Sequence, residues 1–584
     1  HRFDESWQWN ETYTYVKLKQ NADIAEVASE LNGFAKEANQ QQWDEQKMYW
    51  KYSLQAITDI HLTQGISHES EAVSSKSNLW FLSGIAAFLL IIAYINFVNL
   101  TIVKSLKRLK EVGVRKVSGA NRIQLFVQFL LDSTITNALA FLLAIVILST
   151  FNGLLNSYFE IKTENLIFSN YSFPLFCFGF FLLLLLSCSL YLGVIISSFK
   201  PTAILKGNLS NGSSRLSFKN GLIILQFVVS TLFLIATFLV YKQVNFMQSS
   251  DTGMDLEKIV IINTPKVFHY KYDNSFEQFR NELSKQAGIV SVAGSGSVPG
   301  EAIFMYNNQV EIGSTSIEGV FKNLPITNGF FDQYEISLLA GKDFTEPSRD
   351  WSIVNETAMK TLGYEKPEDI LGVRTSLGQI MGVVEDYHHE SLKTEITPTV
   401  FFYGNPLNYY SVKLKGNSIA ALMDKTETVY KDLFPDSPFN YFFADEFYNR
   451  QYKSERQFSK LFAFFAALVT FISCIGFLAL TSYAVKQKTK EIGIRKTFGA
   501  SNLQIMYMLN RRFMKFILIA VVVAIPIANY LLSEWLKGFA YRIELNWIYF
   551  LIPCLLVIGI ALLAVSSQSF KAAGVNPASS IRVE

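Results

Sequence analysis

The sequence predicts an α-helical membrane protein that carries a folded α+β domain outside the membrane. Only 17% of its 584 residues are charged, whereas a soluble protein carries about 25%, and the mean hydropathy is +0.22. The charge deficit collects in apolar segments of about 20 residues or more, which as helices cross a hydrocarbon layer of roughly 30 Å. A decapeptide that occurs twice indicates, in addition, that the chain consists of two related halves.

Seven segments are long and apolar enough to be transmembrane helices. They lie at about 79–103, 125–150, 173–197, 221–244, 461–485, 513–532 and 547–565. A more polar block, residues 245–455, separates the fourth segment from the fifth. The predicted class is therefore a multi-pass membrane protein with one large domain inserted between two groups of spans.

The positions of Lys and Arg predict which loops face the cytoplasm. The loop between the first two spans carries seven basic residues against one acidic residue, Glu111, and the loops after the third and fifth spans are also basic. The loops at 152–171 and 533–546 are balanced by acidic residues. Because basic loops remain in the cytoplasm, we expect residues 1–76 and 245–455 outside the cytoplasm and the C-terminus inside it.

The repeated decapeptide divides the chain into two copies of one unit. EVGVRKVSGA at 111–120 recurs 380 positions later as EIGIRKTFGA at 491–500, and each copy follows one span and precedes two. We call these two segments the brackets. The second copy also has an upstream span and the large domain, so symmetry predicts the same for the first copy, ahead of residue 1. The complete protein would then have eight spans and two outer domains.

Five regions follow from the spans and the repeat. They are the C-terminal remnant of a first outer domain plus a stalk (1–76), a first three-span unit (77–207), a linker with the fourth span (208–247), a second outer domain (248–455) and a second three-span unit (456–584). Within the second outer domain, strands are predicted at 258–263, 352–356, 379–387 and 409–415, and a helix at 275–287. Residues 440–485 lack Pro, and we expect one continuous helix there that runs from the outer domain into the membrane, with Gly476 too isolated to interrupt it.

Each bracket has the pattern of a short amphipathic helix that ends in a turn. Glu491 and Arg495 are spaced i,i+4, which supports a helix, and Gly499 stands where a helix ends. Ser501 followed by Gln504 is typical of a capping box that opens the next helix. The first copy repeats these features with Glu111 and Arg115, with Gly119, and with Asn121 and Gln124.

Two interpretations of the brackets remain. They could anchor in anionic headgroups, or they could dock a shared partner that offers two equivalent grooves, as a homodimer would. Recurrence of the same residues at the same spacing favours docking, with Ile492, Ile494 and their counterparts Val112 and Val114 as apolar contacts. The candidate docking residues are Glu111, Val112, Gly113, Val114, Arg115, Lys116, Gly119, Glu491, Ile492, Gly493, Ile494, Arg495, Lys496 and Gly499.

With these motifs in place, the sequence resembles the FtsX-like permeases of ABC transporters, which include the MacB type. The pattern E-x-G-x-R-K-x-x-G-A is that family's signature and matches at both brackets. Four further segments resemble the eight-span form with two periplasmic core domains that is common in Bacteroidetes. They are NGLIILQFVVSTLFLIATFLVYKQVNFM (220–247), AGKDF with IVNETAMKTLG (340–363), GVVEDYHHESLKTEI (382–396) and DEFYNRQYKSERQFSKLFAFFA (445–466).

The resemblance implies a function and a set of partners. The outer domain would be a MacB-type periplasmic core domain in a bacterial inner membrane protein, and the brackets would be coupling helices for a separate cytoplasmic ABC ATPase dimer. ATP hydrolysis would drive the outer domains to export or extract antimicrobial peptides, drugs or lipoprotein-like substrates, with a periplasmic adaptor or outer-membrane protein as a further partner. The alternative is a non-transporting regulator or sensor that controls an extracytoplasmic enzyme or kinase. Neither the transporter nor the regulator would bind nucleic acid or need a cofactor.

Other candidate sites are weaker. The chain has no G-x-x-x-x-G-K-[ST] motif, so we expect a partner, not this chain, to hydrolyse ATP, and we predict no catalytic residue. The pair His388 and His389 beside Asp386 could bind a metal, but a surface turn after a strand is favoured and no metal site is predicted. Asp132 in the second span is interpreted as a packing or bracket contact rather than a proton relay.

Overall fold

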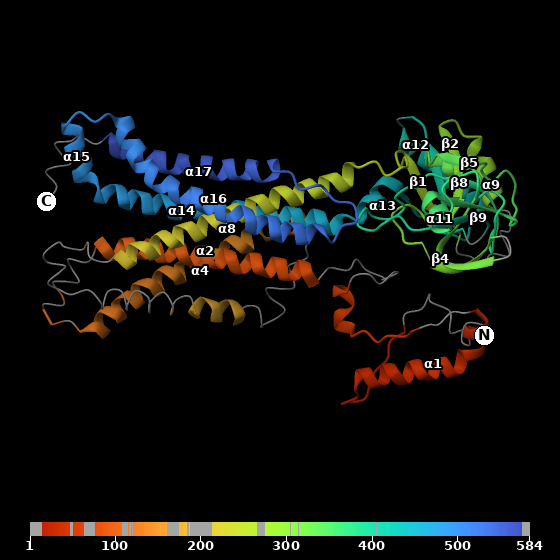
Figure 1. The fold of residues 1–584 in the computed structure, drawn as a ribbon, viewed down its shortest axis with the longest axis horizontal. Helices are drawn as coiled ribbons and strands as arrows, with labels where there is room; N and C mark the ends of the chain where they lie inside the picture. The colour runs from red at the N-terminus through yellow and green to blue at the C-terminus, as the bar shows by residue number, and fades with distance from the viewer. Residues whose placement is uncertain are drawn as a thin grey trace. The chain divides into compact units, whose positions relative to one another are not determined.

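The computed structural model describes most of the chain (Figure 1). The described residues are 14–46, 51–63, 76–107, 115, 118–119, 121–159, 175–183, 186, 213–265, 275–303, 305–312, 315–404, 407–416 and 418–574. The chain forms two compact units, His1–Ser83 and Gly84–Glu584. Each unit is described by itself.

The first unit is built around one helix. Helix α1 (Ile24–Gln46) is followed by the 3₁₀ helix η1 (Ile57–Leu62). The side-chain amide of Asn32 joins α1 to the segment that follows it. Its Nδ2 donates to the Tyr52 carbonyl at 2.8 Å, and its Oδ1 accepts from the Tyr52 N–H at 2.8 Å. The assignment of residues 1–76 to a remnant domain with a stalk stays a prediction.

Six helices in the described part of the chain are long and apolar enough to cross a membrane. They are α2 (Lys76–Lys107), α4 (Arg122–Phe159), α8 (Ser213–Ser249), α14 (Lys453–Gln487), α16 (Asn502–Leu536) and α17 (Ile548–Ala573). They match six of the seven predicted spans. The remaining span, at 173–197, lies mostly outside the described residues.

Helix α8 is the centre of the membrane bundle. It packs beside α14, α16 and α17 (Figure 1), and 61% of its most apolar window is buried, whereas the equivalent window of α4 is 0% buried. Phe477 of α14 joins the helices, because its ring makes edge-to-face contacts with Phe227 of α8 at 4.9 Å and with Phe513 of α16 at 5.5 Å between ring centroids. Such aromatic pairs favour a fixed packing of neighbouring helices.

The chain between α8 and α14 folds into a mixed α+β domain, which we call the outer domain. Its strands are β1 (Ile259–Asn263), β2 (Ile289–Ser295), β3 (Met305–Ile312), β4 (Thr315–Ile326), β5 (Leu338–Gly341), β6 (Trp351–Asn355), β7 (Arg374–Thr375), β8 (Gly378–Val384), β9 (Thr399–Tyr403), β10 (Tyr409–Leu414) and β11 (Tyr441–Phe443). Its helices are α9 (Ser275–Ser284), α10 (Phe330–Gln333), α11 (Glu356–Thr361), α12 (Ile419–Leu433) and α13 (Ala444–Arg450). The predicted α-helical membrane protein with an α+β outer domain is confirmed.

The strands form a closed ring and an open extension. The ring runs β4-β3-β7-β8-β6-β9 and closes because β9 pairs in parallel with β4, from Lys322 opposite Thr399 to Ile326 opposite Tyr403. The extension is β11-β1-β10-β2, which joins the ring where Ser295 of β2 pairs with Ile326 of β4. The long strand β4 is therefore the element that holds both parts of the sheet together.

Strand β1 explains why the sequence shows an unbroken apolar run there. Ile259 and Ile261 face the core that contains Phe330 and Phe401, whereas Val260 and Ile262 face the core under α9 and α12. A strand buried on both faces loses the alternation of polar and apolar residues. The strands predicted at 258–263, 352–356, 379–387 and 409–415 and the helix predicted at 275–287 are all confirmed, with small differences at their ends.

The continuous helix expected over 440–485 is wrong in its first part. Residues 441–443 form β11, which pairs with Val260–Ile262 of β1, and a turn separates α13 from α14. The turn is held by Tyr452, which is completely buried and whose hydroxyl accepts from the Leu392 N–H at 3.1 Å. From Lys453 onward the expected helix is present, and Gly476 does not interrupt it.

Candidate functional site

The second bracket is a short helix followed by a tight turn. Helix α15 (Thr489–Thr497) connects α14 to α16. The chain then turns at Gly499, whose φ of 87° is in the left-handed region that favours glycine. The N–H of Gly499 donates to the Lys496 carbonyl at 3.0 Å and that of Ala500 to the Arg495 carbonyl at 3.0 Å. The predicted helix and turn are confirmed at this bracket.

The turn leads into a capping box in both copies. At the second bracket the Gln504 N–H donates to Ser501 Oγ at 3.3 Å, and the Ser501 N–H donates to Gln504 Oε1 at 3.0 Å. At the first bracket the Gln124 N–H donates to Asn121 Oδ1 at 2.8 Å, and the Asn121 N–H donates to Gln124 Oε1 at 3.0 Å. These bonds satisfy N–H groups that the first turn of a helix leaves open. Both capping boxes are confirmed.

The two brackets also share their turn geometry. Gly119 has a φ of 93°, close to that of Gly499. Of the other candidate docking residues in the first bracket, Glu111, Val112, Gly113, Val114 and Lys116 lie outside the described residues, so their placement stays a prediction. Arg115 is described and its guanidinium donates to Gln128 Oε1 at 2.9 Å.

A charged triplet lies on the outside of α15. Glu491 accepts from Arg495 at 2.9 Å and from Lys488 at 3.1 Å, and the hydrogen bond from Lys488 is the main cause that lowers the pKa of Glu491. The i,i+4 pair that the spacing predicts is therefore present. All three side chains are at least one-third exposed, so the pair stabilises the isolated helix only slightly and its charges remain available to a partner.

The apolar residues of the bracket divide between an inner and an outer face. Ile492 is only 3% exposed and packs in a cluster with Ile505, Leu509 and Ala573. Ile494 is 44% exposed, and Phe498 is 88% exposed. The expectation that both isoleucines are open to a partner is therefore corrected. Ile492 fixes α15 to the bundle because its side chain is already buried.

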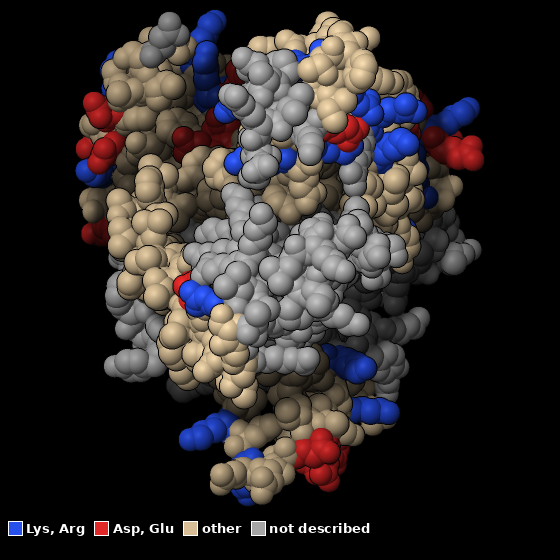
Figure 2. Space-filling model, turned by 90° about the vertical axis from the view of Figure 1, so that its left-hand side faces the viewer, with Lys and Arg blue, Asp and Glu red and all other residues tan. Residues whose placement is uncertain are grey.

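The exposed face continues beyond the bracket. Leu503 and Tyr507 in the first turns of α16 are 76% and 67% exposed, and sequence reasoning missed them because it assigned this segment to the capping box and the following span. Figure 2 views the end of the molecule at which α15 lies, and Lys and Arg side chains gather in its upper part. Exposed basic residues of these helices include Lys486 of α14, Arg495 of α15, Arg511 of α16 and Lys571 of α17.

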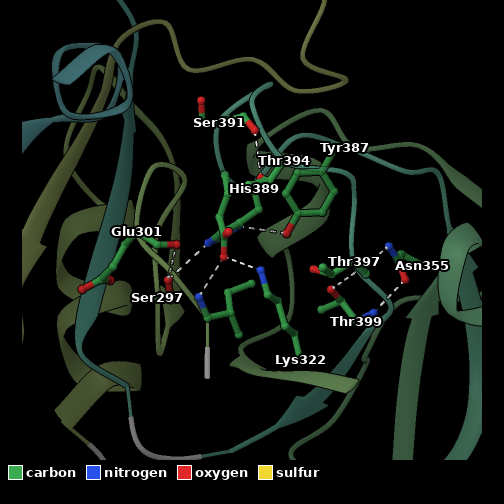
Figure 3. Close-up of polar contacts among 12 residues, drawn as sticks. Ser297, Glu301, Lys322, Asn355, Tyr387, His389, Ser391, Thr394, Thr397 and Thr399 are labelled. Atoms are coloured by element: carbon green, nitrogen blue, oxygen red, sulfur yellow. Dashed lines mark hydrogen bonds and ion pairs between the residues drawn. The ribbon is translucent and has the colours of Figure 1, made fainter. Parts of the chain in front are cut away.

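His389, the second residue of the histidine pair, lies in a polar cluster inside the outer domain (Figure 3). His389 is 7% exposed, with Nε2 at 3.2 Å from Ser297 Oγ and Nδ1 at 3.2 Å from the Tyr387 hydroxyl. Burial, with a smaller effect of Lys322, lowers the pKa of His389 to about 3. The expected surface turn is therefore wrong for His389, which is a neutral, buried side chain. Among the described residues, no three His, Cys, Asp or Glu side chains come together as metal ligands would.

A small cavity lies next to this cluster. Its volume is about 30 Å³, and Lys322, Asn355, Glu390 and Thr397 are among the residues that line it. Lys322 forms an ion pair with Glu390, so the buried ammonium is compensated. A cavity of this size holds about two water molecules and excludes a drug-sized ligand.

Asp132, the other candidate, has an exposed side chain on α4. The interpretation of Asp132 as a packing or bracket contact is not tested and stays a prediction. The polar residues that the bundle buries include the amides Asn96, Asn99 and Gln226. Gln226 Nε2 donates to the Ser473 carbonyl at 2.9 Å, which ties α8 to α14.

Comparison with known proteins identifies the membrane segments. The profile of the FtsX-like permease C-terminal family matches residues 83–201 and 463–577, and each match contains one bracket. No curated protein matches the chain.

Two solved structures share limited similarity with the chain. A domain of a permease protein from Porphyromonas gingivalis is 16% identical with a TM-score of 0.22, and the match covers 32% of this chain and 88% of that one. The extracellular domain of the noncanonic ABC-type transporter YknZ from Gram-positive bacteria is also 16% identical with a TM-score of 0.22, covering 31% and 97%. The assignment rests on the two profile matches, by which two segments of the chain, residues 83–201 and 463–577, each match the C-terminal domain of the FtsX-like permeases.

Proposed function

We propose that this chain is the permease subunit of an ABC transporter, and that a separate cytoplasmic ATPase docks on the two brackets. The observation that carries the proposal is the division of α15 into two faces. Ile492 is buried and fixes the helix, while Phe498 projects into solvent beside the exposed Glu491–Arg495 pair. A fixed helix that presents an exposed aromatic side chain within a charged rim has the composition of a protein-binding hot spot.

Docking explains the bracket better than attachment to lipid does. Anionic headgroups would attract basic residues alone, whereas the bracket holds an acidic residue, Glu491, between Lys488 and Arg495. The same turn ends both brackets, and the same capping box follows each of them. Two equivalent docking helices in one chain suit a partner with two-fold symmetry, because such a partner presents the same groove twice.

The route from the second bracket to the outer domain is a single long helix, α14. Helix α8 ends at Ser249 directly before the outer domain, and α14 begins at Lys453 directly after it. A displacement of α15 by the ATPase would therefore reach the outer domain along α14. In this proposal the outer domain moves in response to ATP hydrolysis and acts on its substrate outside the cytoplasm. The chain is a protein of the bacterial inner membrane, and its C-terminus and both brackets lie in the cytoplasm.

The substrate class is the least constrained part of the proposal. Antimicrobial peptides, drugs and lipoprotein-like molecules are all far larger than the cavity of about 30 Å³ beside Lys322. This cavity therefore does not hold them, and in this proposal the substrate is bound at the surface of the outer domain, with or without a periplasmic adaptor or outer-membrane partner. The second candidate is a regulator whose outer domain binds an extracytoplasmic enzyme or kinase and which transports nothing.

The docking proposal is tested by charge reversal at both brackets. The variant with Arg115→Glu and Arg495→Glu is purified in detergent, which removes lipid headgroups as a confounder, and the ATPase that co-purifies is quantified. We expect at least a tenfold loss of the ATPase, and a similar loss for Phe498→Ser. Arg349→Glu, an exposed arginine of the outer domain, is the matched control and should retain the ATPase. Retention of the ATPase by the double reversal, in a chain of unchanged thermal midpoint, would refute the docking role.

A further inference from the structure

The histidine-containing motif of the outer domain contacts the start of α14 and the loop between α16 and α17. Residues 388–393, which we call the junction segment, follow β8 and contact three other parts of the chain. We propose that the junction segment is a third mechanical connection between the outer domain and the membrane bundle, in addition to α8 and α14, and that His388 and Lys393 are its positioning residues. This inference rests on the proposed function for the direction in which movement is passed.

The first set of contacts joins the junction segment to the loop between α16 and α17. The N–H of Tyr541 donates to the Leu392 carbonyl at 3.2 Å, and the N–H of Ala540 donates to the Lys393 carbonyl at 3.1 Å. The rings of His388 and Tyr541 meet edge to face, 4.5 Å apart between centroids and at 90°. Burial lowers the pKa of His388, so the neutral ring is the form that makes this contact at neutral pH.

The second set of contacts joins the junction segment to the start of α14. Lys393 forms an ion pair with Glu455 in the first turn of α14, and the Glu455 side chain is only 10% exposed. The Leu392 N–H donates to the hydroxyl of the buried Tyr452. Removing one partner of such a buried pair leaves an uncompensated charge, which is costly.

The third set of contacts joins the junction segment to the rest of the outer domain. The Tyr448 hydroxyl of α13 donates to the carbonyls of His388 at 3.0 Å and Glu390 at 3.2 Å. The Gly300 N–H donates to the His389 carbonyl at 2.7 Å, and Glu390 pairs with Lys322 of β4. The junction segment therefore cannot move without the outer domain.

The loop on the other side of the junction is equally fixed to the bundle. Gln243 of α8 is completely buried, and its Nε2 donates to the Tyr541 carbonyl at 3.0 Å. Its Oε1 accepts from the Ile543 N–H at 2.9 Å. The same loop thus contacts α8 through Gln243 and the outer domain through the junction segment.

The mechanical consequence follows from the number of attachment points. A rigid body attached at two points can still rotate about the line that joins them, and a third point away from that line removes this rotation. With α8 and α14 alone, the outer domain could tilt independently of the bundle. With the junction segment in contact with the α16–α17 loop, a displacement of either α14 or the α16–α17 pair is passed to the outer domain.

The test measures distances between labels in the full chain. Thr428 of α12 and Glu544 of the α16–α17 loop are both exposed, and nitroxide labels are attached to cysteines at these positions after the four native cysteines are replaced by alanine. In nanodiscs without nucleotide we expect one narrow distance distribution. Lys393→Glu combined with Tyr541→Ala should at least double its width, whereas the charge swap of Lys393→Glu with Glu455→Lys, which re-forms the ion pair and leaves Tyr541 in place, should keep the narrow distribution.

A matched control separates a loosened junction from a damaged domain. Lys413→Glu breaks an ion pair with Asp255 and Glu335 inside the outer domain, where the Lys413 side chain is 16% exposed. It should lower the thermal stability of the outer domain and leave the width unchanged. An unchanged width in the Lys393→Glu and Tyr541→Ala variant would overturn the third connection.

The link to the proposed function is tested separately with the ATPase bound. In the unmodified chain, ATP should shift the distance distribution, and the junction variant should lose at least half of that shift while retaining the ATPase. If the chain binds no ATPase at all, the proposed function is refuted. The third connection is then still tested by the width of the distance distribution measured without nucleotide. An ATP-dependent shift that is unaffected in the junction variant would refute the transmission role alone.

Discussion

Asn96 of α2 and Gly476 of α14 occupy equivalent positions of the two repeats and lie against each other. They are 380 positions apart, the same offset as the two brackets. Asn96 Nδ2 donates to the Ile472 carbonyl at 2.6 Å, and a Cβ added at Gly476 would come within 1.7 Å of Asn96 Oδ1. Equivalent residues of two halves that are related by a two-fold axis meet only near that axis, so such an axis would pass close to this contact.

Gly476→Ala should destabilise the bundle because the new methyl group occupies the space of the Asn96 amide. Overpacking of this kind costs about 1–3 kcal/mol, and we expect the thermal midpoint of the purified chain to fall by several degrees. Adding Asn96→Ala to Gly476→Ala should recover part of the loss. Gly559→Ala on α17 is the control, since nothing lies within 4 Å of its added Cβ. Equal midpoints for Gly476→Ala and Gly559→Ala would contradict the contact.

The stability of the outer domain should fall on acidification because of His389. Burial lowers the pKa of His389 from 6.5 to about 3, so between these values the unfolded chain binds a proton that the folded chain does not. Stability from this group is complete above pH 6.5 and is lost as the pH falls towards 3, by up to about 1.4 kcal/mol per pH unit.

The comparison with His389→Gln isolates this group. Burial raises the pKa values of Glu301 and Asp343. Their effect on the pH dependence of stability is opposite to that of His389, because the folded state binds their protons before the unfolded state does as the pH falls. These carboxyls titrate in both proteins, so their contribution cancels in the difference. The outer-domain transition, followed by calorimetry of the full chain from pH 7 to pH 4, should shift downward more for the unmodified protein. Parallel pH profiles would show that His389 is not buried as a neutral side chain.

Alanine substitutions at Gly341 and Gly329 distinguish the cost of a steric clash from the cost of backbone strain in the outer domain. Both have a positive φ, 80° and 78° respectively. A Cβ at Gly341 would lie 2.0 Å from the Met381 carbonyl oxygen, whereas nothing lies within 4 Å of one at Gly329. We expect Gly329→Ala to cost about 1 kcal/mol from conformation alone, and Gly341→Ala to cost clearly more because the β5–β8 pairing must shift. Denaturant unfolding of the two variants measures the difference, and equal losses would disprove the close approach.

Local patterns in the sequence predicted the elements whose stability is local. The capping boxes at Asn121 and Ser501 join groups three residues apart, and the bracket turn needs only Gly499 in the left-handed region, so neighbouring residues determine both. The spans are predicted for the same reason, because an apolar run of sufficient length is itself the signal. Pairings between distant segments gave no such signal.

The wrong expectations all concern contacts across long sequence distances. The helix expected from residue 440 fails because Tyr441–Phe443 pairs with β1, almost two hundred residues earlier. His389 was expected at the surface, but Ser297 and Lys322, which come from other parts of the chain, enclose it. The inward position of Ile492 depends on Ala573 of α17. In each case the partner cannot be inferred from the residues adjacent in sequence.

Ile492 and Phe498 should give opposite phenotypes, because one fixes α15 and the other is presented to a partner. Ile492→Ala removes buried methyl groups from the cluster with Ile505 and Leu509, and a substitution of this kind costs about 2–5 kcal/mol. We expect faster hydrogen exchange of the α15 amides in this variant. Phe498→Ala removes a side chain that is 88% exposed, so exchange of these amides should not change, while the co-purified ATPase should decrease. If Phe498→Ala also accelerated exchange, Phe498 would be stabilising α15 itself, and the proposed division of the bracket into a fixed inner face and a docking outer face would be wrong.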